Sequence, residues 1–188
     1  MPLRKALFAA ILTLSACASD PLQSVAVEST PAPDRVGIRY TDVFVREVSL
    51  PTYAASETIF IAAANGLLTE QPTSVWADDP TRAITLGLAA SLQEISRARV
   101  APEPWPFGAN PEVAVDVRFE TLAPGADGTY RASGQVFVAP DEVDATNRAL
   151  TFRMSETYDL AGGQPAIARA RATLVSRLAA DIARRGLR

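Results

Sequence analysis

Apolar and polar residues alternate most strictly along residues 113–120. Valine or phenylalanine occupies every odd position there, whereas most even positions are charged, which is the pattern of a strand with one buried face and one wet face. The alternation returns in residues 130–138 and again in residues 150–154. A turn-forming run, Pro-Gly-Ala-Asp-Gly at residues 124–128, separates the first two segments. Together they predict an antiparallel meander of three strands.

Two further segments repeat their apolar residues at the helical period. In the first, Asp79 supplies an N-cap carboxylate and Pro80 has the φ of a first helical position. We expect this helix to end near Arg97 and Arg99, whose charge suits a C-terminal turn. Its apolar stripe consists of Ile84, Leu88, Leu92 and Ile95.

The second helix is predicted after Gly162-Gly163, with Pro165 in its first turn. Its apolar face consists of Ile167, Leu174, Val175, Leu178 and Ile182. Most of its arginines lie elsewhere on the helix, at Arg169, Arg177, Arg184 and Arg185. A basic helix of this kind marks either a membrane surface or an ordinary solvated face, and we favour the solvated face.

Residues 37–51 predict a strand with both faces partly covered. Residues 59–61 and the run that begins at Leu67 predict a hairpin, because Asn65-Gly66 accepts positive φ at both central positions of a tight turn. Trp76 lies between this hairpin and the first helix. Of its two possible roles, an anchor in the core and a surface for stacking a ligand, we favour the core anchor.

Four prolines make residues 101–111 unsuitable for regular helix or central strand. We expect Trp105 and Phe107 in this loop to cover one end of the core, with an exposed contact for a partner as the alternative. The complete pattern predicts one α+β domain, with a single mixed or antiparallel sheet and two main amphipathic helices packed on one face.

The N-terminus has the pattern of a secretory signal peptide. Arg4 and Lys5 precede an apolar run, residues 6–14, that is too short to span a bilayer. The following residues, Leu-Ser-Ala-Cys at 14–17, resemble the bacterial lipobox, whose cysteine is lipidated. An ordinary signal peptide with an incidental cysteine is the alternative. We favour lipidation, with acyl chains such as palmitate, because the only cysteine of the chain, Cys17, falls at the position that the lipobox requires.

This reading divides the chain into a signal peptide at residues 1–16, a lipidated N-terminus and flexible spacer at 17–34, and a domain at 35–188. Removal of residues 1–16 takes away two basic and no acidic residues, so 16 basic and 21 acidic side chains remain, with a net charge of −5. That balance argues against a nucleic-acid partner. Ala18 and Ser19 follow the cysteine, and by family-level sorting patterns they favour the outer membrane over the inner membrane.

The composition removes much of enzyme chemistry. The chain has no histidine, one lysine at Lys5 and one cysteine, so a His-dependent nucleophile, a His/Cys metal site and an internal disulfide are excluded. We expect no catalytic residue, no metal and no cofactor. A hydrolase that uses paired carboxylates stays open as an alternative. The acidic residues available for it are Asp78, Asp79, Glu112 and Asp116.

With the lipobox, residues 50–53 (Leu-Pro-Thr-Tyr), the hairpin, the meander and the terminal helix in this order, the chain resembles the ABC-type transport auxiliary lipoproteins, the PqiC/YmbA-like family. The most specific point of resemblance is Trp76-Ala77 just ahead of the amphipathic helix. Family members often carry Glu-Pro after the alanine, whereas here Asp78-Asp79 precede Pro80. We therefore interpret the motif residues Trp76, Ala77, Asp79 and Pro80 as structural.

The resemblance implies a non-catalytic auxiliary component of a lipid transport system. Such a lipoprotein would sit at the outer membrane, face the periplasm and dock onto an ABC transporter component or a mammalian-cell-entry (MCE)-type substrate-binding protein. A ring-like homo-oligomer is conceivable within that family. The alternatives are the carboxylate-dependent hydrolase of the envelope and a lipoprotein that assists cell-wall or lipopolysaccharide assembly.

Overall fold

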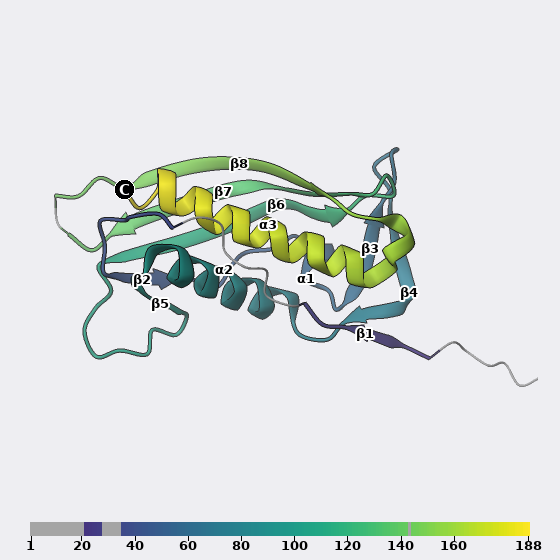
Figure 1. Cartoon of the computed structure of the whole chain (residues 1–188), viewed down its shortest axis with the longest axis horizontal. Helices are drawn as coiled ribbons and strands as arrows, with labels where there is room; N and C mark the ends of the chain where they lie inside the picture. Colours follow the sequence, from purple (N-terminus) through teal and green to yellow (C-terminus); the bar gives the residue numbers. More distant parts are fainter. Residues whose placement is uncertain (1–20, 28–34, 143) are drawn as a thin grey trace, which may run out of the picture.

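The computed structural model describes residues 21–27, 35–142 and 144–188 (Figure 1). The N-terminal half contains β1 (Gln23–Val25), β2 (Asp42–Val45), α1 (Thr52–Ala55), β3 (Thr58–Ala62), β4 (Leu68–Trp76) and α2 (Pro80–Ser96). The C-terminal half contains β5 (Arg99–Pro102), β6 (Val113–Pro124), β7 (Thr129–Pro140), β8 (Arg148–Thr157), the 3-10 turn η1 (Leu160–Gly162) and α3 (Gly163–Arg185).

The strands form two sheets, so the prediction of a single sheet is wrong, although the α+β class is confirmed. A three-stranded sheet has the order β1-β4-β3, and a five-stranded sheet has the order β5-β2-β6-β7-β8. The sheets approach each other at an isolated bridge between Ala62 and Gly125, where Ala126 N donates to Ala62 O at 2.9 Å. Pro124, which has no N–H, precedes that bridge, and the chain then turns into β7, so the ladder does not continue.

Both long helices lie side by side on one face of the five-stranded sheet, as predicted (Figure 1). The buried stripe of α2 is the predicted one, at Ile84, Leu88, Leu92 and Ile95. It packs with the inward-facing valines of the sheet, among them Val43, Val45, Val113, Val115 and Val117. The other face of this sheet carries the polar residues of β6 to β8.

The predicted meander is confirmed. β6 pairs antiparallel with β7, and β7 pairs antiparallel with β8. The register places Gly134 opposite both Phe119 and Phe152. Their rings meet edge to face at 5.4 Å between centroids, because the glycine between them carries no side chain.

The predicted hairpin is β3 with β4, but its turn differs in detail. Gly66 has a φ of 82°, whereas Asn65 does not have positive φ. Gly66 N donates to Ala63 O at 3.0 Å, and Ala63 N donates to Leu67 O at 2.8 Å. One left-handed glycine therefore closes a longer loop than the two-residue turn that was expected.

Three short strands depart from the predicted pattern. The extended segment at 37–51 contains only four strand residues, in β2. Arg99–Pro102 form β5, which pairs parallel with β2 even though the predicted loop begins at residue 101. β5 is an edge strand, where a proline at the end costs no ladder hydrogen bond. β1 forms from residues of the predicted spacer and pairs parallel with β4.

Candidate functional site

The family-like motif lies at the corner where β4 passes into α2. Trp76 ends β4 with 7% of its surface exposed, and Ala77 N donates to Val25 O of β1 at 3.0 Å. Asp79 Oδ1 accepts from Arg82 N at 2.7 Å, and Pro80 occupies the first turn of α2. The predicted helix cap is thus confirmed, and the acidic residue is engaged by the backbone of its own helix.

A buried arginine from α3 stacks on this tryptophan. The Cζ atom of Arg171 lies 3.6 Å from the centroid of the Trp76 ring, and the arginine is only 3% exposed. Arg171 Nε has no hydrogen-bond partner among the described residues. A cation over an indole face is favourable, but the ring face offers no hydrogen-bond acceptor to the Nε–H group.

The surroundings of Arg171 are poorly suited to a free charge. Burial lowers the pKa of Arg171, while the neighbouring Tyr130 and Asp78 act in the opposite direction. Tyr130 is itself 2% exposed, and burial raises its pKa to about 12, so its hydroxyl is neutral at physiological pH. Arginine stays protonated in proteins. The corner therefore holds a positive charge whose Nε has no hydrogen-bonded anion among the residues that the structure describes.

Arg171 also lines a groove between α2 and α3 with a volume of about 320 Å³. The α2 side of the groove is a second stripe, distinct from the core stripe, and it repeats at helical spacing through Ala83, Leu86, Gly87, Ala90 and Ser91. Ala172 and Val175 form the α3 side. Leu86 is 39% exposed, so an apolar surface is open to solvent beside the buried charge.

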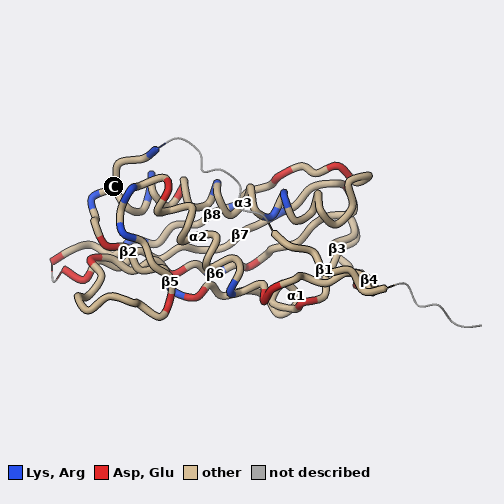
Figure 2. Tube along the Cα trace, turned by 60° about the horizontal axis from the view of Figure 1, so that its bottom comes forward, with Lys and Arg blue, Asp and Glu red and all other residues tan. Residues whose placement is uncertain are grey.

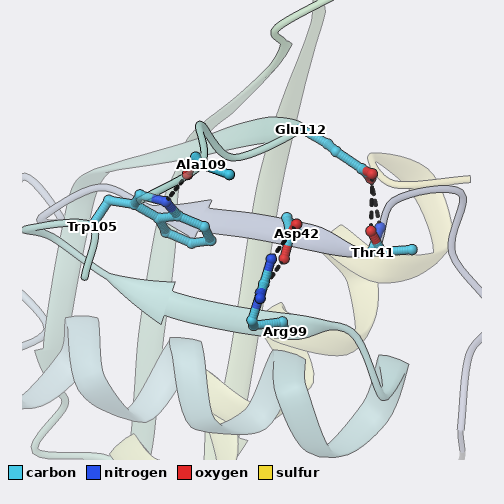
Figure 3. Close-up of polar contacts among 6 residues, drawn as sticks. All are labelled: Thr41, Asp42, Arg99, Trp105, Ala109 and Glu112. Carbon is cyan, nitrogen blue, oxygen red and sulfur yellow. Dashed lines mark hydrogen bonds and ion pairs between the residues drawn. The ribbon is translucent and has the colours of Figure 1, made fainter. Parts of the chain in front are cut away.

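A second candidate surface is the loop at residues 103–111, which we call the aromatic loop. Trp105 meets Phe44 and Phe107 edge to face, with centroids 6.1 and 4.9 Å away. Its indole N–H donates to Ala109 O at 2.7 Å, as Figure 3 shows. Because Phe44 alternates with the buried Val43 and Val45, these rings lie on the sheet face opposite the helices.

This loop leaves an aromatic ring in solvent. Phe107 is 40% exposed, and the Cζ atom of Arg99 lies 4.6 Å from its ring centroid. Neither ring belongs to the core cluster of the described residues, so the expected cover of the core is not found: Trp105 is half-buried against Phe44, and Phe107 remains accessible. The alternative, an exposed contact for a partner, stays a prediction.

Two carboxylates fix the chain around the aromatic loop (Figure 3). Arg99 makes a two-pronged ion pair with Asp42, in which Nη2 lies 2.6 Å from Oδ2, and this hydrogen bonding lowers the pKa of Asp42. Glu112 accepts from the backbone and hydroxyl of Thr41 at 2.6 and 2.9 Å, and these hydrogen bonds lower its pKa. Both acids hold structure and are ionised at neutral pH.

The acidic residues considered for hydrolysis are not gathered in one cleft. Asp78 pairs with Arg82 at 2.5 Å at the start of α2. Glu112 binds Thr41, and Asp116 pairs with Arg118 at 2.8 Å on the face of the sheet away from the helices. Within residues 21–27, 35–142 and 144–188, no cluster of three potential metal-binding side chains is found.

Sequence reasoning and structure agree unevenly on the site residues. Cys17 lies outside the described residues. Trp76, Ala77, Asp79 and Pro80 come together at the β4–α2 corner. Arg171 was missed, although a signal existed: it lies four residues after Ile167 and three before Leu174, so a charge interrupts the apolar stripe of α3.

The distribution of charge along the described residues does not point to a further candidate site. Basic and acidic residues are interspersed along the trace in Figure 2, including the end that holds the C-terminus. In the part of the chain that the structure describes, no helix is long and apolar enough to cross a membrane.

Two solved structures share this fold. A crystal structure of an uncharacterised protein superposes with a TM-score of 0.67 at 17% identity, covering 86% of this chain and 98% of that one. Protein XCC0632 from Xanthomonas campestris gives a TM-score of 0.63 at 13% identity, covering 85% and 92%. A comparison with curated proteins finds no match.

The sequence itself matches a family model described as the ABC-type transport auxiliary lipoprotein component, over residues 22–183. The match extends from the residue before β1 almost to the end of α3, and so includes both sheets, the β4–α2 corner and Arg171. The chain belongs to the family of ABC-type transport auxiliary lipoprotein components.

Proposed function

We propose that this chain is an outer-membrane lipoprotein, anchored through Cys17 and facing the periplasm, that serves as a non-catalytic auxiliary component of an ABC transport system for lipids. The family match over residues 22–183, which begins shortly after a lipobox-like sequence at residues 14–17, is the observation that carries this proposal. The dispersed carboxylates support a role without catalysis, because the paired geometry of a glycosidase requires two of them across one cleft.

The positions of β1 and the aromatic loop at opposite ends of the molecule support a docking role. β1 lies at one end of the long axis of the molecule, and the aromatic loop lies at the opposite end (Figure 1). Pro21 follows Cys17 by four residues, which span at most about 14 Å. A domain held so closely by its β1 end presents the aromatic loop away from the membrane.

The proposed partner is an ABC transporter component or an MCE-type substrate-binding protein, and the proposed contact is the exposed Phe107. Aromatic residues at the centre of an interface often carry much of its binding energy. Phe107 is held by Arg99 and Trp105, so little conformational freedom is lost when a partner covers it.

The test is a pull-down of the full lipidated chain from envelope membranes. The wild-type chain should recover a permease, an ATPase or an MCE-type protein, and Phe107→Ser should reduce that recovery about tenfold or more. Leu160→Ser is the matched control, because Leu160 is 60% exposed in the turn between β8 and α3, away from the aromatic loop. Recovery of no transport component by the wild-type chain would contradict the proposal.

A further inference from the structure

The Nε atom of Arg171, buried without a hydrogen-bond partner beside an apolar groove, is the strongest unexplained feature of the described residues. A buried charge destabilises the fold unless it is paired and hydrogen-bonded. Trp76 compensates part of that cost through its ring face, but it offers no acceptor for Arg171 Nε. An acceptor that arrives with a ligand would satisfy this group.

Arg171 is itself part of the wall of the groove. Arg171, Ala172 and Val175 of α3 line the same cavity as the exposed Leu86 and its neighbours on α2. Arg171 lies near Asp78, at the end of the groove where α2 begins, and Glu94 lines the groove close to the other end of α2. The N-terminus of a helix also favours negative charge, so the α2 start and Arg171 act in the same direction.

Asp78 does not fill the position of the missing anion. Its carboxylate accepts from Asp79 N at 2.9 Å and pairs with Arg82 at 2.5 Å, and no hydrogen bond joins it to Arg171 Nε. Its charge is thus shared with groups that lie outside the groove. Within residues 21–27, 35–142 and 144–188, the Nε atom of Arg171 therefore has no hydrogen-bonded anion, and a ligand could supply one.

We infer that the groove between α2 and α3 binds an amphiphile with an anionic headgroup, a phosphate or a carboxylate, whose oxygen accepts from Arg171 and whose alkyl chain lies along Leu86, Gly87, Ala90 and Val175. Guanidinium groups bind both anions through charge-assisted hydrogen bonds. A volume of about 320 Å³ lies at the lower end of the range for ligand pockets, which fits one short chain and not a whole phospholipid. This inference deepens the proposed function and takes its biological meaning from it.

The binding test uses tryptophan fluorescence. The chain has two tryptophans, so Trp105→Phe leaves Trp76, which stacks on Arg171, as the sole reporter. Octyl phosphate and octanoate, each below its micelle concentration, should change the fluorescence with saturation. Octyl glucoside supplies the chain without the charge, and inorganic phosphate supplies the charge without the chain. Each should bind at least about tenfold more weakly than octyl phosphate.

Arg171→Gln should weaken octyl phosphate binding by about 10- to 100-fold, because it removes a hydrogen bond between charged groups. Arg169→Gln is the matched control: it makes the same change at an exposed position two residues away and should leave binding unaltered.

Ala90→Phe independently tests the part of the groove that would hold the alkyl chain of the ligand. Ala90 is exposed, so the new ring fills the groove without entering the core and should also abolish saturable binding.

Three results would overturn the inference: equal binding by folded Arg171→Gln, equal binding of octyl glucoside, or equal binding of inorganic phosphate. The last result would mean that the site takes a free anion. The measurement uses the isolated chain, whereas the docking proposal is tested in membranes through Phe107. Loss of the partner contact with intact ligand binding, or the reverse, therefore tells the two failures apart.

Discussion

At the scale of single residues, Asp127 shows how one side chain closes a turn. Asp127 Oδ1 accepts from Thr129 N at 3.1 Å, and its carboxylate pairs with Arg131 at 2.5 Å. The hydrogen bond from Arg131 lowers the pKa of Asp127 from 3.8 to about 2. This pair lies on the surface, so its contribution to stability is small and is reduced by salt.

The lowered pKa predicts a specific pH dependence. A carboxylate whose pKa is depressed by folding stabilises the native state above its unfolded pKa, and this contribution disappears as the pH falls from about 4 to about 2. Asp127→Asn should therefore lose slightly less stability than the wild type over that interval. Urea unfolding at a series of pH values measures it. Asp144→Asn makes the same change at another exposed site and serves as the comparison, and identical curves for Asp127→Asn and the wild type would refute the prediction.

Arg171 illustrates what a sequence conveys about a single residue and what it does not. Its place in the apolar stripe of α3 marks it as unusual, since arginine is seldom fully buried without a partner. That it stacks on Trp76, 95 positions earlier in the chain, depends on how the β4–α2 corner packs on α3. No local pattern contains that information.

At the scale of elements, Gly134 joins the three meander strands. A Cβ atom at this position would lie 2.1 Å from the backbone oxygen of Arg118, next to the register shift between Phe119 and Thr121. The missing side chain thus allows both the bulge in β6 and the contact between the rings of Phe119 and Phe152.

Gly134→Ala should lower the free energy of unfolding by about 3 kcal/mol, because the backbone of β6 must move to admit the methyl group. Thermal or urea denaturation measures the loss. Ser133→Ala is the control: it lies beside Gly134 on β7 and removes one exposed hydroxyl contact with Thr121, so it should cost less than about 1 kcal/mol. If Gly134→Ala were as stable as the control, the backbone of β6 would move to admit the methyl group at little cost, and the prediction would be wrong.

The elements differ in how far the sequence predicts them. β6, β7, β8 and both long helices follow from periodicity, because each buries one face along many residues. β2 and β5 each have four residues, too few for a period to be distinguished from chance. The prolines of residues 101–111 also concealed β5, since a proline is acceptable at the end of an edge strand.

At the scale of the whole molecule, the second sheet was only partly predictable, for a related reason. Its hairpin of β3 and β4 was predicted, but its third strand is β1, three residues in a stretch whose Ser, Pro and Ala content predicts a spacer. Val25 is nevertheless 9% exposed and pairs opposite Trp76. Such a strand forms because an edge of β4 is available to it, which is a property of the folded domain and not of residues 23–25 themselves.

The proposed lipid anchor at Cys17 leads to a prediction at the same scale. Cys17→Ser should abolish incorporation of labelled fatty acid and move the chain out of the outer-membrane fraction, since each buried methylene of the acyl chains contributes about 0.8 kcal/mol to membrane binding. Ser19→Ala, a change of similar size just after the cysteine, should retain both properties. A Cys17→Ser chain that still incorporated fatty acid would exclude the lipobox interpretation.

β1 also has a mechanical consequence. Any pull on an anchor at Cys17 reaches the fold first at β1, whose three residues are paired with Ser74, Val75 and Trp76 of β4. While that pairing holds, only four residues separate Cys17 from Pro21, the first residue that the structure describes. If the pairing gave way, the chain from Cys17 to Arg35 would span up to about 60 Å. The shortest of the described strands would then act as a release under load, and the domain could move farther from the membrane that we propose holds Cys17.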